Sequence, residues 1–285
     1  MIPFISLASL YHRASDFQRR DSEKSFKEYK EIMKWRADGR DTLIDIGSGP
    51  GNVLMKSIYP MLPAKFNAVL ATDISERMID YARQKYGDVE RANFEVLDIA
   101  SAQLPQHLCG QFDHLISFFC LNWVQNQRRA LQNIYQLLRR SGGDCLLVFV
   151  ANHPFYEIFM ELSKSEKWGR YMADAMQYIS PLYNSEDPVA DYNKLLHENG
   201  FVDCNVEVRN ETFVFEGAQN FKDNLRAITP FLSRIPEGQH EEFLYDLVQV
   251  LLKMKVCNGQ ISERDFKCTT LYKLVVVYAR KCSEL

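Results

Sequence analysis

The sequence predicts an α/β protein with a mostly parallel, doubly wound sheet, and three observations carry this prediction. An apolar, β-rich segment at residues 43–46 runs directly into a loop with three glycines. Three further short apolar runs follow at residues 68–73, 94–99 and 112–117, and each contains an acidic residue. Segments with helical periodicity separate these runs, which is the order of repeated strand–helix–strand units.

Before the first strand, residues 1–36 are expected to form an N-terminal arm and one helix. Apolar residues recur at helical spacing between residues 22 and 35, so a helix that packs on the sheet is predicted there. Its expected core residues are Phe26, Tyr29, Ile32 and Met33. The preceding residues 11–21 are mostly polar and charged. In an α/β enzyme such a segment can fold over the carboxyl ends of the strands and supply side chains to the site.

The loop after the first strand has glycine at positions 47, 49 and 51, and Asp45 lies two residues before the first of them. Glycine permits positive φ and a close approach of the backbone to a ligand, and the helical segment at residues 52–59 then offers free N–H groups. The spacing differs from the G-x-G-x-x-G of dinucleotide sites. An acid before the loop suits the cationic end of a ligand better than a diphosphate.

The second and third strands end beside carboxylates, Asp73 and Asp98, and the fourth runs to Ser117. Asp73 lies about twenty residues after the glycines, where a carboxylate accepts hydrogen bonds from ribose hydroxyls. This pattern resembles the class I S-adenosylmethionine (AdoMet) methyltransferases. The resemblance implies a Rossmann-like seven-stranded sheet and AdoMet as cofactor. The implied cofactor-binding residues are Asp45, Gly47, Gly49, Gly51, Asp73, Ile74, Asp98, Ile99 and Ser117.

The later core elements continue the alternation of helix and strand. Ser75 is a suitable N-cap for a helix at residues 76–86, and a second helix opens at Asn126 or Gln127. An apolar strand is predicted at residues 145–151, as expected where helices cover both faces.

After the fifth strand, the pattern predicts a cap that is mainly helical. Helical patterns occur at residues 155–162, 188–200 and 218–256, strand-like alternation at 206–209 and 213–215, and a last strand at 271–279. We therefore predict a single domain. It comprises the arm and helix at 1–36, a core at 40–151, cap segments at about 152–200 and 216–262, and a final strand at about 270–280.

Composition and charge narrow the classes of function. With 46% hydrophobic and 25% charged residues, the chain resembles an ordinary globular protein, and its net charge of -3 gives no drive toward nucleic acid. Seven scattered cysteines without a C-x-x-C pair argue against a disulfide framework and against a zinc site. We find no apolar segment as long as a membrane span and no basic leader, so we expect a cytoplasmic location. Because no metal-ligand cluster is present, we expect no metal.

Several enzyme classes lack their motifs in this chain. No G-x-S-x-G elbow and no metal-ligand cluster is present, and His114 lies within the fourth strand, where a core histidine is the simpler interpretation. The segment at residues 117–120 is not the acidic or Asn, Pro, Pro, aromatic run of methyltransferases that act on amides or exocyclic amines. The methyl acceptor is therefore expected to be an oxygen, a carbon or a small amine.

A more specific resemblance extends over nearly the whole chain, to the insect juvenile hormone acid O-methyltransferases. The segments that carry it are residues 18–21, 45–49, 72–75, 96–99, 112–114, 121–126, 142–147, 205–210 and 272–276. This resemblance implies methyl transfer from AdoMet to the carboxylate of a sesquiterpenoid of the farnesoic acid or juvenile hormone acid type.

In that family a Gln of the N-terminal segment and a Trp after the fourth strand hold the acceptor carboxylate, and they match Gln18 and Trp123. The family usually has His before that Trp, whereas this chain has Asn122, which still offers a donor and an acceptor. A carboxylate is ionised at neutral pH, so no general base is required. Aromatic residues that could form an apolar pocket wall are Phe119, Phe155, Trp168 and Phe231.

Two alternatives remain open from the sequence. Asn122 is compatible with a methyltransferase for another small apolar acid or hydroxyl compound. The chain is also compatible with a catalytically silent protein that binds AdoMet or a terpenoid as a carrier or sensor. In each case the expected partner is a small apolar molecule, and the sequence does not determine the oligomeric state.

Overall fold

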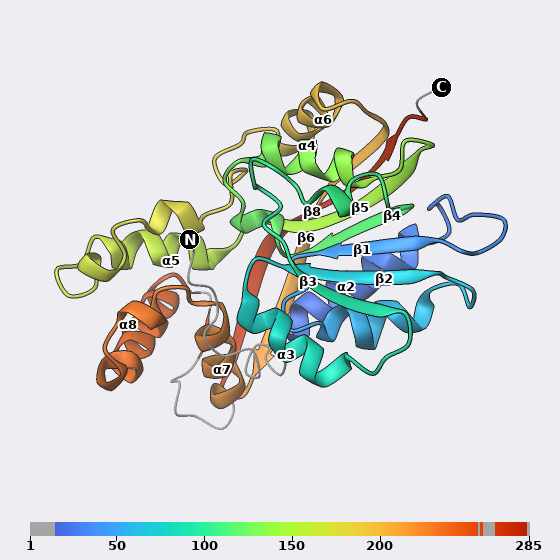
Figure 1. The fold of residues 1–285 in the computed structure, drawn as a ribbon. Coiled ribbons are helices and arrows are strands. Elements are labelled where there is room, and N and C mark those ends of the chain that lie inside the picture. The colour runs from blue at the N-terminus through green and yellow to red at the C-terminus, as the bar shows by residue number, and fades with distance from the viewer. Residues whose placement is uncertain (1–14, 256, 259–265, 284–285) are drawn as a thin grey trace.

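The computed structural model describes residues 15–255, 257–258 and 266–283 of the chain. An eight-stranded sheet forms its centre, in the order β3-β2-β1-β4-β5-β8-β6, with β7 paired to β8 (Figure 1). The strands are β1 Thr42–Ile46, β2 Ala68–Asp73, β3 Ala92–Val96, β4 His114–Phe118, β5 Gly143–Asn152, β6 Phe201–Glu216, β7 Cys257–Asn258 and β8 Lys267–Lys281. Strands β1 to β5 pair in parallel, and β8 is antiparallel to β5 and β6. The predicted fold class is confirmed, and the two-residue β7 is an addition to the seven expected strands.

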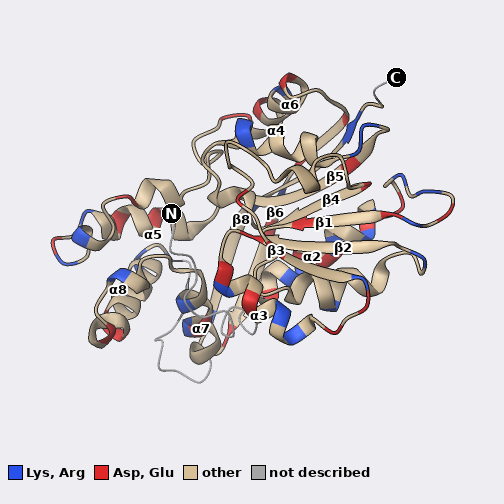
Figure 2. Ribbon diagram, in the orientation of Figure 1, with Lys and Arg blue, Asp and Glu red and all other residues tan. Residues whose placement is uncertain are grey.

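Helices cover both faces of the sheet, and three further helices lie beyond the carboxyl ends of the parallel strands (Figure 1). The helices are α2 Asp16–Tyr29, α3 Glu76–Tyr86, α4 Gln127–Leu137, α5 Pro154–Ser163, α6 Pro188–Glu198, α7 Ala218–Ile228 and α8 His240–Lys253. Residues of α4 and α6 pack in one apolar core, and residues of α2, α3 and the α5, α7 and α8 cap pack in the other. Lys and Arg are spread over the outer helices and loops in the view of Figure 2. No helix of the described ranges is long and apolar enough to cross a membrane.

Helix α2 differs from its prediction in both bounds. It begins at Asp16 and ends at Tyr29, so Gln18 lies in its first turn and not in an irregular segment before the helix. The buried side of this turn carries Gln18, Asp21 and Ser22 beside Phe17, and apolar periodicity does not detect a polar face of this kind. Phe26, Tyr29 and Met33 are buried as predicted, but Ile32, which lies beyond the end of the helix, is exposed.

The segment after the glycine loop is helical but irregular. A π-helical turn, Leu54–Ile58, replaces the regular helix predicted at residues 52–59, and a 3₁₀ turn, Tyr59–Met61, follows it. Pro60 has no N–H and cannot continue the α-helical hydrogen-bond pattern.

The predicted caps of the next two helices are confirmed. The Ser75 hydroxyl accepts a hydrogen bond from the Met78 N–H at the start of α3. The Asn126 side chain accepts one from the Arg129 N–H at the start of α4, 3.0 Å away. Both bonds satisfy backbone donors that have no partner within the helix.

The sequence argued against a disulfide framework, but Cys268 is disulfide-bonded. The antiparallel register places the backbone of Cys257 opposite Cys268. Cys109, Cys120, Cys145, Cys204 and Cys282 are free cysteines. Spacing along the sequence does not detect a strand pairing of this kind.

His114 lies at the amino ends of the parallel strands, buried between two acids. Its Nδ1 is 2.6 Å from Asp144 Oδ1 and its Nε2 is 3.0 Å from Asp41 Oδ1, so both nitrogens can donate when the ring is protonated. Burial alone would lower its pKa, but the hydrogen bonds to Asp144 and Asp41 raise the pKa of His114 to about 9. The prediction of a core histidine is confirmed.

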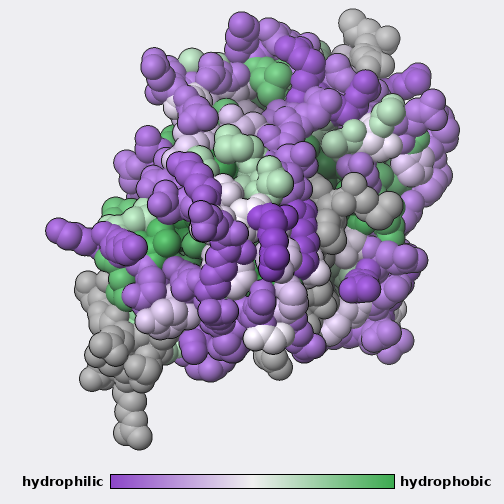
Figure 3. Space-filling view, turned by 90° about the vertical axis from the view of Figure 1, so that its left-hand side faces the viewer, coloured by the Kyte–Doolittle hydropathy of each residue, from purple (hydrophilic) through white to green (hydrophobic). Residues whose placement is uncertain are grey.

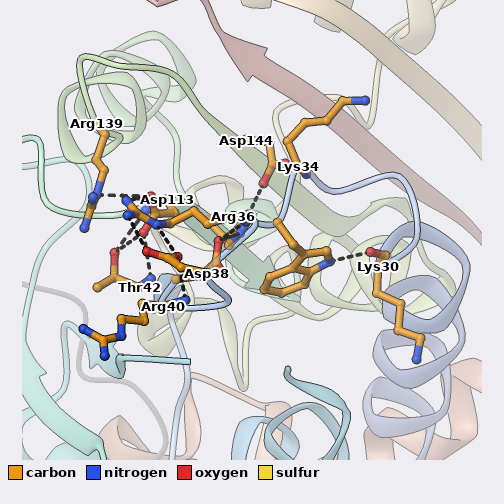
Figure 4. A network of polar contacts seen from close by, with 12 residues as sticks. Lys30, Lys34, Arg36, Asp38, Arg40, Thr42, Asp113, Arg139 and Asp144 are labelled. Carbon is orange, nitrogen blue, oxygen red and sulfur yellow. Dashed lines mark hydrogen bonds and ion pairs between the residues drawn. The ribbon is translucent and has the colours of Figure 1, made fainter. Parts of the chain in front are cut away.

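Asp144 and a further acid, Asp113, hold the loop that connects α2 to β1 (Figure 4). Asp144 Oδ2 accepts from the Lys34 N–H at 2.7 Å, and Asp113 Oδ2 accepts from the Thr42 N–H at 2.8 Å. Arg139 lies 3.2 Å from Asp113 Oδ1. This network stabilises the edge of the sheet opposite the carboxyl ends.

We expect the free energy of unfolding to decrease as pH rises from 7 to about 9.5. Because the folded-state pKa of His114 is above the unfolded value, its contribution is complete below about pH 6.5 and is lost as pH rises through about 9, with a total of about 3 kcal/mol. Urea unfolding at several pH values measures this decrease. His114→Gln should be less stable at pH 7 and show a flatter pH profile, and an unchanged profile would contradict the assignment.

Candidate active site

The site lies where the order of the strands reverses. Strand β1 pairs in parallel with β2 on one side and with β4 on the other, and in such sheets ligands bind at the carboxyl ends of these strands. A cavity of about 410 Å³ occupies this position. It is lined by Ile46, Gly47, Gly49, Asp73, Ile74, Met78, Leu97, Asp98, Ile99, Ala100, Phe119, Cys120, Trp123, Val124, Gln125, Asn126 and Gln177.

The glycine loop approaches the loop after β4 very closely. Gly47 has φ +73°, and a Cβ built on it would lie 2.3 Å from the Cβ of Cys120. Only glycine fits between the two loops without displacing one of them. The loop is also held from β2, because the Ser48 N–H donates to the Thr72 carbonyl at 2.8 Å.

Asp73 connects the glycine loop to the start of α3. Its Oδ2 accepts from the Gly49 N–H at 2.9 Å and its Oδ1 accepts from the Ser75 N–H at 2.8 Å. Burial raises the pKa of Asp73, although these two N–H groups favour the ionised form. A carboxylate oxygen has two lone pairs, so each oxygen can still accept from a ligand hydroxyl.

Asp45 lies beneath the loop and is 2% exposed. Its Oδ1 has no hydrogen-bond partner among the described residues. Burial and the nearby charge of Asp73 raise the pKa of Asp45 to about 8. A nearby cation would favour the ionised form of a buried acid of this kind.

The structure brings together most of the predicted cofactor-binding residues. Gly47, Gly49, Asp73, Ile74, Asp98 and Ile99 line the cavity, whereas Asp45, Gly51 and Ser117 are not among the lining residues. Ser117 is buried and its hydroxyl donates to the Ile46 carbonyl at 2.9 Å, which joins β4 to β1. Gly51 packs near Ala82 and Phe94. These positions give Ser117 and Gly51 supporting roles in the structure.

The sequence did not reveal several lining residues. Met78 lies in α3, and Val124, Gln125 and Asn126 follow β4. The segment at residues 121–126 carries the family resemblance, but the sequence assigned these residues no role in the site. Gln177 belongs to the cap and carries no such signal. Its carbonyl accepts from the Gln125 side chain at 2.9 Å, which connects the cap to the loop after β4.

A second, smaller cavity of about 60 Å³ adjoins the first, and Phe119 and Trp123 line both. Its lining residues are Phe17, Gln18, Phe119, Asn122, Trp123, Val150, His153, Phe155, Tyr156, Phe159 and Ile228. Gln18, Asn122 and Trp123, which the sequence predicted to meet the acceptor, therefore share one cavity beside the predicted cofactor site. Of the proposed wall residues, Phe119 and Phe155 line it, whereas Trp168 and Phe231 are buried elsewhere in the cap.

Phe119 has φ +55°, a left-handed conformation that is unusual for an aromatic residue. Its N–H donates to the Val148 carbonyl at 2.7 Å, and its ring packs edge-on against Phe17 at a centroid distance of 5.3 Å. These contacts maintain the conformation and place the ring between the two cavities. Strained residues of this kind are concentrated at functional sites.

The first turn of α2 is fixed by contacts with distant strands. Asp21 is 1% exposed and accepts hydrogen bonds from Arg20, at 2.7 Å, and from the Tyr272 hydroxyl on β8. This arrangement leaves Gln18, which is 4% exposed, facing the second cavity. The Gln18 Oε1 has no partner in the described part of the chain. A rotation of this amide would turn its N–H donors toward a ligand.

Asn122 contacts Trp123 directly. In the amide orientation that satisfies both of its ends, Asn122 donates to the Phe119 carbonyl at 3.2 Å and accepts from the Trp123 indole N–H at 3.0 Å. Asn122, which stands where the family usually has His, thus orients the indole. An incoming carboxylate would compete with Asn122 for this N–H.

The doubly wound sheet, the acid-lined crevice at its switch point and the adjoining apolar cavity together define a class I methyltransferase. Residues 44–144 match the family described as methyltransferase domain. Phosphoethanolamine N-methyltransferase 2 from Haemonchus contortus, solved in complex with S-adenosyl-L-methionine, is similar in fold, with a TM-score of 0.52 at 16% identity. This similarity covers 91% of this chain and 52% of that chain.

Two relatives define the family more narrowly. Juvenile hormone acid O-methyltransferase from Drosophila melanogaster is 48% identical over 277 residues, which are 97% of this chain and 93% of the relative. The Bombyx mori protein of the same name is 34% identical over 96% of this chain and 97% of its own. The chain belongs to the juvenile hormone acid O-methyltransferase family, and the resemblance inferred from the motifs is confirmed.

Two matched substitutions test the glycine loop. Gly47 and Gly51 have similar φ angles, +73° and +77°, so alanine at either position introduces about 1–2 kcal/mol of backbone strain. At position 51 the nearest atom would be 3.5 Å from the new Cβ, whereas at position 47 the Cys120 Cβ would be 2.3 Å away. We expect Gly47→Ala to weaken AdoMet binding about tenfold more than Gly51→Ala, measured by calorimetry. Equal losses would argue against the close approach to Cys120.

Proposed function

We propose that this protein transfers a methyl group from AdoMet to the carboxylate of a sesquiterpenoid acid of the farnesoic acid or juvenile hormone acid type. The observation that carries the proposal is the pair of cavities that share Phe119 and Trp123. One cavity has acids that suit a cationic nucleoside. The other is apolar except for a few polar side chains that suit one carboxylate. The relatives from Drosophila melanogaster and Bombyx mori, both named juvenile hormone acid O-methyltransferase, support the same reaction.

The residues of the larger cavity fit AdoMet. Asp73 suits the ribose hydroxyls, and Gly47 and Gly49 bring the loop backbone to the cavity wall. Asp45 does not line the cavity but is buried near Asp73, and its oxygen without a partner suits the ammonium end. Ile74 and Ile99 provide apolar surface for the adenine ring. When bound, AdoMet supplies a methyl group on a positively charged sulfur.

The residues of the smaller cavity have to orient the acceptor and exclude water. A carboxylate is already ionised at neutral pH, so the protein does not have to remove a proton. Gln18 and Trp123 can hold one end of the carboxylate while an oxygen remains aligned with the methyl group. The aromatic walls keep the reacting oxygen poorly hydrated, which strengthens these contacts.

The cap is expected to enclose the isoprenoid chain. The cavity of about 60 Å³ is smaller than a sesquiterpenoid, so binding of the whole acceptor requires side chains of α5 and α7, such as Phe159 and Ile228, to move. Figure 3 shows the cap side of the molecule, where small hydrophobic areas lie between hydrophilic side chains. An apolar chain is therefore better accommodated inside the cap than on this surface.

A methyl-transfer assay with labelled AdoMet and a panel of acceptors tests the proposal. We expect turnover of farnesoic acid or juvenile hormone acid, and little turnover of the corresponding alcohols. Turnover of another acid or of a hydroxyl compound, with none of the terpenoid acids, would reject the proposed acceptor. Binding of AdoMet without any product would favour a carrier or sensor.

AdoMet affinity is expected to increase as pH rises from 6 to about 8. Asp45 is protonated below its pKa of about 8 in the absence of ligand, and a bound cation favours its ionised form, so binding releases a proton. Linkage of a single proton permits up to about a tenfold change in affinity per pH unit. Calorimetry in buffers of different ionisation enthalpy measures the released proton. Asp45→Asn should bind weakly and without this pH dependence, and the same dependence in the variant would exclude Asp45 as its source.

A further inference from the structure

His153 lies at the junction between β5 and α5, outside every motif that the sequence indicated. It is 4% exposed, and its ring lies 4.3 Å from the ring of Phe155 and 5.5 Å from that of Tyr272, measured between centroids. Its Nδ1 accepts a hydrogen bond from the Phe155 N–H at 3.2 Å, which caps α5. A nitrogen that accepts carries no proton, so in the neutral ring the proton is on Nε2.

This Nε2–H group is buried and has no hydrogen-bond partner among the residues that the structure describes. His153 lines the small cavity that Gln18 and Trp123 also line. A buried polar group left without a partner costs about 1–3 kcal/mol. The unpartnered Gln18 Oε1 shares the same cavity, whose other walls are mostly apolar. Two polar side chains in this state indicate a polar ligand group between them.

The protonation state identifies His153 as a donor and excludes it as a base that accepts a proton at Nε2. Burial lowers the pKa of His153 to about 3, so the ring is neutral at physiological pH. A neutral ring whose Nδ1 is already engaged can only donate through Nε2. A carboxylate accepts such a bond without any transfer of a proton.

We propose that His153 is a third carboxylate-holding residue, and that its Nε2–H donates to the acceptor carboxylate together with Gln18 and Trp123. This inference rests on the proposed function, because it concerns the same acceptor. The three side chains come from α2, the loop after β4 and the end of β5, so they approach the cavity from different elements. This arrangement can hold a planar carboxylate at more than one point, which favours the acid over the uncharged ester product.

His153→Asn and His153→Gln separate this role from the capping of α5. Asn can retain the acceptor for the Phe155 N–H but is too short to replace Nε2, whereas the longer Gln side chain can place an amide N–H near that position. We expect His153→Asn to lower kcat/KM for the acid by 10- to 100-fold, with AdoMet affinity within twofold of wild type. His153→Gln should recover at least part of that loss.

The decisive measurement is binding, because it does not depend on turnover. Calorimetry in the presence of S-adenosylhomocysteine compares farnesoic acid with its methyl ester for the wild type and for His153→Asn. We expect the variant to lose affinity for the acid by 10-fold or more and to keep its affinity for the ester within twofold. Equal losses for acid and ester, or no loss for either, would overturn the inference. A wild type that binds the acid without methylating it would reject the proposed function and still test His153.

Discussion

Replacing Asp73 with Asn is expected to weaken AdoMet binding by about 100-fold or more. Both oxygens of Asp73 accept backbone N–H groups, from Gly49 at 2.9 Å and from Ser75 at 2.8 Å. An amide presents NH₂ on one side, so one of these N–H groups would face another donor. The variant would lose a charge-assisted hydrogen bond to the loop and an acceptor for the ribose. Together these losses reduce the binding free energy of AdoMet by about 3 kcal/mol.

Calorimetric titration with AdoMet measures this loss, and Asp80→Asn is the matched control. Asp80 lies on α3 at 3.3 Å from Arg83, and both side chains are about half exposed, so its neutralisation should change affinity by less than twofold. Thermal unfolding of both variants shows whether the fold persists. An Asp73→Asn protein that keeps wild-type affinity would remove this carboxylate from the cofactor site.

The cofactor half of the site was predictable because its signals are local in sequence. Asp45 and the three glycines lie close together in the sequence, at residues 45–51. Asp73 and Asp98 follow short apolar runs that are typical of buried strands. In a parallel sheet these strand ends meet at one edge, so a linear pattern becomes a cluster in space. Asp73 and Asp98 accordingly line one cavity.

The acceptor half depends on contacts that the sequence does not display. The turn that carries Gln18 is held by a hydrogen bond between Asp21 and Tyr272, which lie 251 residues apart. The buried face of that turn is mainly polar, so the helical spacing of apolar residues is detectable only from residue 22 onward. The helix was therefore predicted to start at residue 22 instead of residue 16. His153 joins the same cavity only because β5 ends beside α2, and a single His at a strand end carries no motif.

The substitution Gln18→Leu is expected to lower kcat/KM for the terpenoid acid by about 100- to 1000-fold, the range found when one preorganised donor is removed from an active site. Leu is similar to Gln in size and removes the polar atoms from a cavity that is otherwise largely apolar. The acceptor carboxylate would then lose a partner in a place that water does not easily reach. AdoMet affinity should remain within twofold, because Gln18 does not line the larger cavity.

Ser22→Ala is the control for damage to α2. Its hydroxyl donates to the Gln18 carbonyl at 2.6 Å and is buried, so its loss should cost about 1 kcal/mol of stability without removing a group from the acceptor cavity. We expect kcat/KM of this variant to fall by less than threefold. If Ser22→Ala reduced activity as much as Gln18→Leu, the effect would come from the helix and not from a contact with the acceptor.

Gln18→Glu distinguishes an electrostatic contact from packing. The new carboxyl group would be buried beside the acceptor carboxylate, which raises its pKa, and once ionised it would repel the acceptor. The activity of this variant should therefore decrease further as pH rises through that pKa, whereas the loss in Gln18→Leu should be independent of pH. Initial rates between pH 6 and 9 measure the difference. Two parallel, flat profiles would mean that the side chain of Gln18 does not meet a charged acceptor, and the carboxylate would then have to be held by Trp123 and His153 alone.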